Sequence, residues 1–305
     1  MYVAAALFTS AATAVTAAVP LTPEPASGLA ARPHAQEPVR PYIVTARDRA
    51  AARALVREMR WGVRRSYTAA LPGFATSLTA AEEAELRADP RVTALEPDRA
   101  VHPLPARRVR ARARAVTGAG VTVYVVSSGL RATGERAWRA FDATGGTGQD
   151  CTGHGTRTAR AVSAAAPRAR LASVRALGCD GHGSLSDVLA ALDWVRRHAR
   201  KPAVAAVPLG GAGSPALALA ARRLTGSGVL VVRAARRGTC RVGPGGQAYS
   251  AAVPRLAGAA ARHLERDPGA SPAALASRLG CGPARNPIRQ KASRTSNLLL
   301  RTGEL

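Results

Sequence analysis

The chain has 305 residues, enough for one large domain and a smaller one. Hydrophobic residues make up 47% of it but aromatic residues only 4%, so its core must consist mostly of Ala, Val and Leu. The formal net charge of +25 comes almost entirely from arginines, which are spread along the chain without an RNA-binding signature, zinc finger or basic heptad. We therefore expect no nucleic-acid partner; an Arg-rich protein that binds anionic partners, such as nucleic acid, is kept as an alternative.

Residues 1–30 are predicted to be a secretory signal peptide and the start of a linker. Residues 3–19 are apolar and small, and Ala12-Thr13-Ala14 fits a signal cleavage site, although the usual basic residues before the apolar stretch are missing. The alternative is an Ala-rich disordered tail. No later stretch is apolar and long enough to span a bilayer. The sequence thus predicts a secreted protein without a membrane partner.

Residues 38–101 are predicted to fold as a small α+β module. Its expected elements are a strand at 42–44, a helix at 47–60, a hairpin at 66–78, a helix starting at 79 and a strand at 92–96. Thr79 and Glu82 have the spacing of a capping box at the start of the second helix. That helix should stop at Asp89, because a residue before proline avoids the helical conformation. A basic linker, residues 102–117, follows.

Residues 118–305 are predicted to form an α/β domain with a mainly parallel sheet and helices on both faces. The expected strands are 121–126, 171–176, 203–209 and 228–232, and the expected helices are 186–198, 216–224 and 271–279. Strands that alternate with helices build βαβ units, whose sheet is parallel. The last helix has a clear start and stop, with Ser271 as N-cap, Pro272 in its first position and Gly280 after its end.

Four cysteines, at positions 151, 179, 240 and 281, indicate two disulfides, because an even number in an exported chain is typical of a disulfide framework. No Cys-x-x-Cys pair occurs, so a zinc site is not expected. No other metal site is predicted from the sequence.

Six motifs, in the right order, resemble the proteinase K branch of the subtilisin-like serine proteases. They are GAGVTVYVVSSGL from Gly118, QDCTGHGTRTA from Gln149, SVRALGCDGHGS from Ser173, VLAALDWV from Val188, KPAVAAVPLGG from Lys201 and SAAVPRLAGAAARHLE from Ser250. Residues 67–101 are similar to the inhibitor-type propeptide of these enzymes. The resemblance implies a secreted serine endopeptidase precursor that acts on peptides or proteins. It also implies a propeptide that packs on the protease domain with its tail in the substrate cleft.

In this family a Ser attacks the substrate, a His takes up the proton and an Asp orients the His. The resemblance assigns the base to His154 and the nucleophile to Ser250, just before a helix. The alternatives are a surface histidine in a Gly-rich turn, and a misplaced or buried serine, because the bulky Tyr249 stands where the family has a small residue. The resemblance also implies a set of residues that line the substrate cleft: Gly183, Leu209, Gly210 and Gly211.

Two positions that catalysis needs are replaced. Ser127 stands at the position of the orienting Asp, and Arg237 at the position of the Asn that stabilises the oxyanion. In subtilisin, loss of the acid alone costs roughly 10⁴ in turnover and loss of the oxyanion donor roughly 10² to 10³. Only twelve residues separate Arg237 from Ser250, where the family has several times more. The sequence therefore predicts a catalytically impaired pseudoprotease, with an active endopeptidase as the alternative.

The resemblance also bears on the disulfides and on cofactors. It implies that Cys151 pairs with Cys179, a bridge that contributes about 3 kcal/mol in the chain-entropy model. The family partner of Cys240 falls in the missing stretch, so Cys240 either pairs with Cys281 or stays free. The family allows calcium, but no calcium site is identifiable in the sequence, and no other cofactor is expected.

Overall fold

The structure of the chain is a computed structural model that describes residues 38–59, 62–104, 115–210, 213–235, 240–243 and 246–283. From Pro38 onward the chain forms one unit by its internal contacts. Four expectations lie outside the described residues: the signal peptide at 1–30, most of the basic linker, Gly211 and Arg237. Within the described part of the chain, no helix is long and apolar enough to cross a membrane.

The amino-terminal module is a four-stranded antiparallel sheet with two helices, which confirms the predicted α+β module. Its elements are β1 (Arg40–Ala46), α1 (Arg49–Glu58), β2 (Val63–Tyr67), β3 (Gly73–Leu78), α2 (Ala80–Ala88) and β4 (Val92–Pro97), and the strand order is β2-β3-β1-β4. The predicted capping box is present: the Thr79 hydroxyl accepts from the Glu82 amide, and the Glu82 carboxylate accepts from the Thr79 amide. Local hydrogen bonding thus fixes where α2 begins.

The second domain has an eight-stranded sheet in the order β15-β13-β14-β12-β10-β6-β8-β7. Its strands are β6 (Thr122–Ser127), β7 (Ala137–Asp142), β8 (Arg170–Arg175), β10 (Ala203–Val207), β12 (Leu230–Ala234), β13 (Arg241–Val242), β14 (Ala248–Ser250) and β15 (Gly282–Pro283). All neighbouring pairs are parallel except β13 and β14. The predicted mainly parallel sheet is therefore confirmed.

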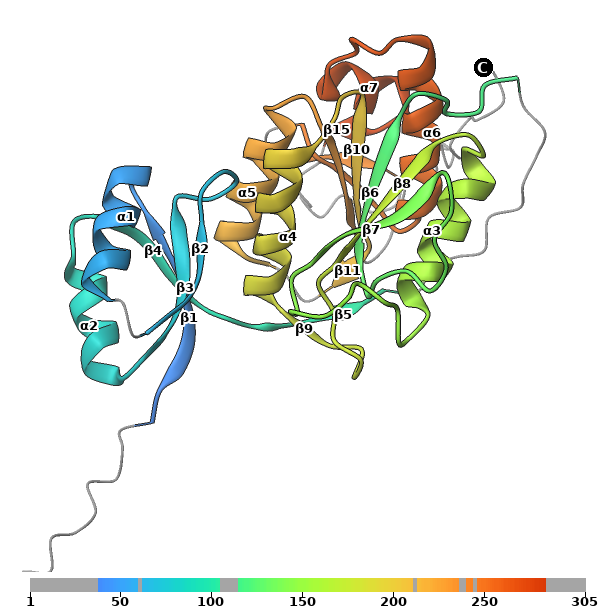
Figure 1. The fold of residues 1–305 in the computed structure, drawn as a ribbon. Helices are drawn as coiled ribbons and strands as arrows, with labels where there is room; N and C mark the ends of the chain where they lie inside the picture. Colours follow the sequence, from blue (N-terminus) through green and yellow to red (C-terminus); the bar gives the residue numbers. More distant parts are fainter. Residues whose placement is uncertain are drawn as a thin grey trace, which may run out of the picture. The chain divides into compact units, whose positions relative to one another are not determined.

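Helices cover both faces of this sheet, as predicted. They are α3 (His154–Ala165), α4 (Leu185–His198), α5 (Pro215–Thr225), α6 (Val253–Arg266) and α7 (Pro272–Arg278). In Figure 1, α4 and α5 lie on one face, and α3 and α6 on the other. Every residue of β6 and β10 is buried. A strand that is covered on both faces has a continuous run of apolar residues. The positions of β6 and β10 could therefore be predicted from the sequence.

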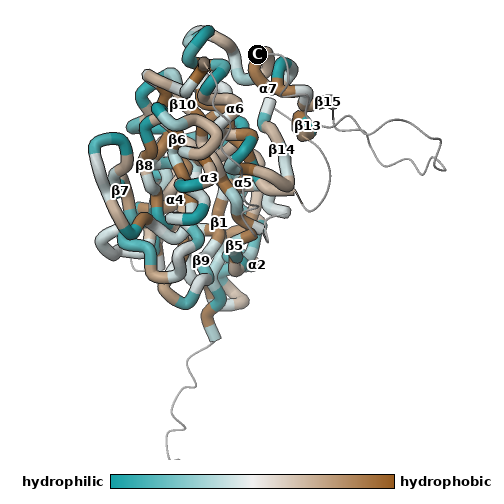
Figure 2. Tube along the Cα trace, turned by 90° about the vertical axis from the view of Figure 1, so that its right-hand side faces the viewer, coloured by the Kyte–Doolittle hydropathy of each residue, from teal (hydrophilic) through white to brown (hydrophobic). Residues whose placement is uncertain are grey.

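Apolar segments alternate with polar ones along the chain, which Figure 2 shows as short brown and teal stretches of the tube. The apolar residues collect in one core on the α4 and α5 face of the sheet and another on the α3 and α6 face. Both cores consist largely of Ala, Val and Leu. The low aromatic content of the chain predicted such a core.

A separate three-stranded sheet, in the order β11-β5-β9, joins the two domains. Its strands are β5 (Ala100–Pro103), β9 (Gly183–Ser184) and β11 (Leu209–Gly210), and both pairings are antiparallel. The predicted boundary between module and linker, after Val101, falls inside β5. The first residues of the expected linker thus belong to the fold, because their backbone groups pair on both sides.

Two disulfides cross-link the second domain. Cys151 is bonded to Cys179, with Cα atoms 5.0 Å apart, as the resemblance implied. Cys240 is bonded to Cys281, with Cα atoms 4.5 Å apart, which decides between the two alternatives left open by the sequence. The second bridge connects the start of β13 to the segment after α7, across a part of the sheet built from very short strands.

Helices α3 and α6 pack closely against each other at Gly258. A Cβ atom added at Gly258 would lie 2.4 Å from the Cβ atom of Ala165, which is fixed to the backbone of α3. Since α3 begins at His154 and α6 begins just after Ser250, this contact sets the spacing of the two candidate catalytic segments.

We predict that Gly258→Ala lowers the free energy of unfolding by about 1–3 kcal/mol, because the helices must move apart to admit the methyl group. Urea or thermal unfolding of the purified protein measures this loss. Gly213→Ala is the matched control, because an added Cβ there meets no atom within 4 Å. Equal stability of the two variants would contradict the close packing at Gly258.

Candidate active site

The predicted base and nucleophile lie at the carboxyl-terminal edge of the parallel sheet. Ser127 is the last residue of β6, and Ser250 is the last residue of β14. Strands β10 and β12 separate β6 from β14, and all four run in the same direction. At about 4.8 Å per strand, Ser127 and Ser250 are about 14 Å apart along this edge. His154 begins α3, which packs beside β6.

Both ring nitrogens of His154 are hydrogen-bonded. Nδ1 lies 2.7 Å from the hydroxyl oxygen of Ser127, and Nε2 lies 2.7 Å from the carbonyl oxygen of Leu104. A carbonyl oxygen can only accept, so the ring hydrogen is on Nε2. Nδ1 then carries the lone pair and accepts from the Ser127 hydroxyl. In this arrangement the neutral imidazole has its hydrogen on Nε2.

This tautomer is the opposite of the one that a general base needs. In a serine protease, Nδ1–H donates to the carboxylate, and the bare Nε2 takes the proton of the serine. The Ser127 hydroxyl can donate its own hydrogen to Nδ1, whereas a carboxylate can only accept. Ser127 therefore does not require Nδ1 to carry the ring hydrogen. His154 is buried, and burial lowers its pKa, with the charge of Arg157 acting in the same direction. The neutral ring is thereby favoured.

Asp150 organises the turn that carries His154. Its carboxylate accepts from the Gly153 amide at 2.7 Å and from the Thr156 amide at 2.8 Å, and also from the hydroxyls of Ser128 and Thr156. Burial alone would raise the pKa of Asp150, but these hydrogen bonds outweigh it and hold the pKa below its ordinary value. Gly153 has φ 80°, a left-handed conformation suited to glycine. Asp150 therefore hydrogen-bonds to the turn, and it acts on the imidazole ring only through its charge, which raises the pKa of His154.

Ser250 is held in the sheet and buried. Only 2% of its surface is exposed, and its hydroxyl accepts from the Ala252 amide at 3.0 Å. Its carbonyl accepts from the Ala235 amide, and β14 pairs in register with β12 up to Ala234. Helix α6 starts three residues later, at Val253. Ser250 therefore precedes the expected helix, as predicted from the sequence. It lies in an extended strand, however, where its buried hydroxyl is hardly accessible to the carbonyl group of a substrate.

The bulky Tyr249 is accommodated by a partner that the sequence did not reveal. Arg233, opposite Tyr249 on β12, donates to its hydroxyl at 3.1 Å, and its guanidinium lies 5.3 Å from the centre of the Tyr249 ring. Arg233 is buried, and burial lowers its pKa. An arginine inside an apolar strand was a signal that some partner had to face it, but nothing in the sequence indicated which residue.

The predicted cleft is filled by residues 100–104 of the same chain. Gly183 pairs with Val101, and the segment Leu209–Gly210 pairs with residues 102–103. The Leu104 amide also donates to the Pro208 carbonyl at 3.0 Å. Three of the four predicted cleft residues thus bind the chain itself through backbone hydrogen bonds. An extended peptide substrate cannot pair with the same edges at the same time.

Carboxylates of the amino-terminal module dock it onto two helices of the second domain. Asp98 accepts from the Ser186 amide at 2.9 Å, in the first turn of α4. Glu96 accepts from the Ala216 amide at 2.8 Å, in the first turn of α5. The first amides of a helix lack partners within the helix, and its amino end favours negative charge. The module therefore supplies the acceptors for the Ser186 amide of α4 and the Ala216 amide of α5.

A reciprocal contact comes from Asp193 of α4. Its carboxylate accepts from the backbone amides of Thr68, Ala69 and Ala70, at 3.1, 2.6 and 2.7 Å, in the turn between β2 and β3. Asp193 is 2% exposed. A buried carboxylate needs several donors to replace its lost water, so the turn and the carboxylate stabilise each other only while the module is docked.

We predict that Asp193→Ala weakens the docking by about 2–3 kcal/mol, because three amides lose a charged acceptor. Hydrogen exchange at residues 68–70 should become about 30- to 160-fold faster. Asp180→Ala serves as the control, because the exposed Asp180 accepts only from the local amide of His182. Unchanged exchange at residues 68–70 in Asp193→Ala would show that this contact does not hold the module.

A second prediction concerns the protonation of His154. Its ¹⁵N signals, assigned with His154→Gln, should show the hydrogen on Nε2 and a titration below about pH 6.5. Because its pKa is lower in the folded protein than in the unfolded chain, the free energy of unfolding should fall as the pH decreases below about 6.5. Ser127→Asp should place a hydrogen on Nδ1 as well as on Nε2, because both nitrogens would then face acceptors, and should raise the pKa of His154. A hydrogen on Nδ1 in the unaltered protein would disprove the assignment.

Comparisons with known proteins agree with these motifs. A family model for peptidase inhibitor I9 matches residues 33–103. An extracellular serine proteinase of Thermus sp. (strain Rt41A) is 38% identical over 195 residues, 55% of this chain and 48% of the relative. Alkaline serine exoprotease A of Vibrio alginolyticus is 32% identical over 54% of this chain and 37% of the relative. Alkaline serine protease ver112 of Corniculantispora psalliotae is 33% identical over 57% of this chain and 53% of the relative.

The chain thus spans about half the length of the curated relatives it matches, or less. Among solved structures, a cold-adapted subtilisin-like serine proteinase is 27% identical, with a TM-score of 0.48, over 58% of this chain and 86% of that one.

Proposed function

We propose that this chain is a secreted pseudoprotease related to the subtilisin-like serine proteinases, because its relatives are serine proteinases and residues 33–103 match the peptidase inhibitor I9 family. In this proposal the inhibitor-type module stays attached and keeps the cleft closed. Secretion is supported by the extracellular relative from Thermus and by the two disulfides, which persist in oxidising compartments.

The observation that carries the proposal is the bonding of His154. Its Nε2–H points to the Leu104 carbonyl and its Nδ1 accepts from Ser127, so no nitrogen is free to take a proton from Ser250. Rotation of the tail out of the cleft would free Nε2, but Ser127 would still lack the charge that stabilises an imidazolium. Loss of that carboxylate costs about 10⁴ in turnover in the subtilisin case. Better substrate binding cannot compensate, since the loss concerns the transition state.

The competing function is that of an active serine endopeptidase acting on peptide bonds. It is favoured by the retention of His154 and Ser250 at the same edge of the sheet. It requires the tail at 100–104 to leave the cleft and Ser250 to become accessible. The two functions therefore differ in the rate of peptide hydrolysis and in whether the chain cleaves itself. Both properties can be measured.

We predict that the purified full chain shows no stoichiometric labelling of Ser250 by a fluorophosphonate probe, and hydrolyses a small chromogenic peptide at least about 10⁴-fold more slowly than ordinary subtilisins. It should also remain uncut between residues 105 and 118 on prolonged incubation, as followed by mass spectrometry. Ser250→Ala sets the background for both assays.

Turnover near that of ordinary subtilisins, abolished in Ser250→Ala, would overturn the proposal and establish the active enzyme. Labelling without turnover would indicate a competent nucleophile beside an incompetent base, which is still a pseudoprotease. Ser127→Asp alone should restore little activity, because the predicted oxyanion position remains Arg237.

A further inference from the structure

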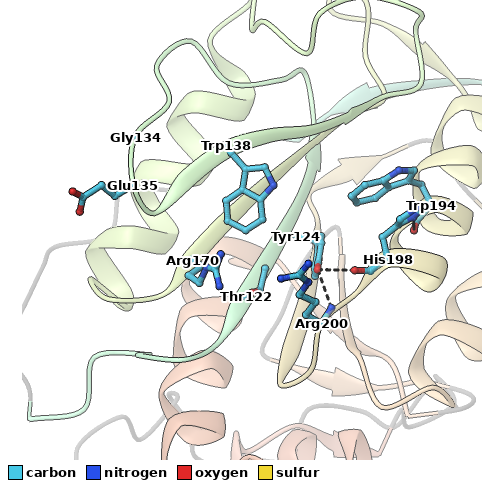
Figure 3. A pocket seen from close by; sticks show the side chains of 9 residues that line it. All are labelled: Thr122, Tyr124, Gly134, Glu135, Trp138, Arg170, Trp194, His198 and Arg200. Atoms are coloured by element: carbon cyan, nitrogen blue, oxygen red, sulfur yellow. Dashed lines mark hydrogen bonds between the residues drawn. The ribbon is translucent and has the colours of Figure 1, made fainter.

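A cavity of about 520 Å³ lies at the end of the sheet opposite to His154. Thr122 and Arg170, the first residues of β6 and β8, lie at this cavity, whereas Ser127 ends β6 beside His154. Its volume falls within the range of about 300–1,000 Å³ that is usual for small-molecule sites. Its lining residues, drawn in Figure 3, are Thr122, Tyr124, Gly134, Glu135, Trp138, Arg170, Trp194, His198 and Arg200.

Aromatic side chains form the walls of this cavity, although aromatic residues make up only 4% of the chain. Two of the three tryptophans line it, Trp138 from β7 and Trp194 from α4. Trp194 is fixed in place because it stacks between Phe141, at 5.6 Å, and His198, at 4.4 Å. Trp138 has no such aromatic stack among the described residues; the Arg170 guanidinium lies over its ring, and the indole offers a flat surface to another planar group.

Two guanidinium groups border the same space. Arg170 lies 5.3 Å from the centre of the Trp138 ring, and Arg200 follows the end of α4. Both side chains are exposed, and within the described ranges neither forms an ion pair with a carboxylate. Glu135 also lines the cavity, but in Figure 3 its carboxylate points away from the two guanidiniums. The cavity thus combines a flat aromatic surface with positive charge that no carboxylate balances.

We propose that this cavity binds a small molecule made of a planar aromatic ring and an anionic group, either a carboxylate or a phosphate. The ring stacks on Trp138, while Arg170 and Arg200 donate to the anion, since the planar guanidinium fork matches the oxygens of both groups. The Tyr124 hydroxyl donates to the His198 carbonyl and accepts from the Arg200 amide, at 3.4 and 3.1 Å, which ties the Arg200 backbone to the cavity floor. The site is independent of His154 and Ser250, so it does not rest on the proposed loss of proteolysis.

Isothermal titration calorimetry of the full chain tests this site with two probes, phenyl phosphate and benzoate. An ionic strength near 0.15 M limits the general attraction of anions to the positive chain, because the Debye length is then about 8 Å. Saturable one-to-one binding of at least one probe is expected. Inorganic phosphate and phenol, each lacking one half of the proposed ligand, should bind at least tenfold more weakly than phenyl phosphate.

Three variants locate the site. Arg170→Gln and Arg200→Gln should each weaken binding about tenfold, and Trp138→Leu should do so at least equally for the loss of stacking. Arg168→Gln is the matched control, because Arg168 is exposed and close in sequence but does not line the cavity. Binding of phosphate alone as tightly as phenyl phosphate, equal weakening by Arg168→Gln, or no saturable binding of either aromatic anion would overturn the proposal.

Discussion

The pairing of β5 between β9 and β11 is the interaction on which the rest of the site depends. This one strand carries the chain from the inhibitor-type module into the cleft, and its continuation brings the Leu104 carbonyl to His154. The hydrogen on Nε2 and the occupied cleft edges follow from that placement, and β5 adds to the docking contacts made by Glu96, Asp98 and Asp193. Because these bonds involve the backbone, they depend on register more than on side-chain identity, and substitutions within β5 leave them largely intact.

Many carboxylates of the described residues bind backbone amides, and some of them, such as Asp193 with Arg197, also pair with an arginine. There are 19 acidic residues against 44 basic ones, so a carboxylate has many arginines to pair with. Yet the buried Glu96, Asp150 and Asp193 each accept from backbone N–H groups, at the start of a helix or in a turn. Such groups cannot move away or bind elsewhere, so they compensate for desolvation more reliably than a long flexible arginine does.

Much of the fold could be predicted from the sequence because its signals are local. The helix caps at Thr79 and Ser271 are each defined by a few consecutive residues. The apolar runs of β6 and β10 are likewise each contained in one short segment. Strand β7 was missed, because Ala137–Asp142 alternates only weakly and contains Arg139. The very short strands β9, β11 and β13 gave no pattern, since two residues show no periodicity.

The sequence predicts which residues stand at the candidate site, but not the hydrogen bonds that those residues form. Its motifs identified His154 and the replacement at Ser127, since those are read from sequence position. Which nitrogen carries the hydrogen depends on Leu104, 50 residues away in the segment that follows β5. The partnership of Arg233 with Tyr249 likewise joins two strands 16 residues apart. Long-range contacts of this kind leave no trace in a single sequence.

In the proposed pseudoprotease, an uncut connection between the module and the second domain has a consequence for competition. A separate inhibitor leaves its target when diluted, whereas a tethered one stays at an effective concentration set by its linker, in the millimolar range for short flexible tethers. The β5 segment therefore competes for the cleft at the same strength whatever the protein concentration. A free peptide would have to exceed that local concentration, and also match the pairing on both sides of β5, before it occupied the cleft in half of the molecules.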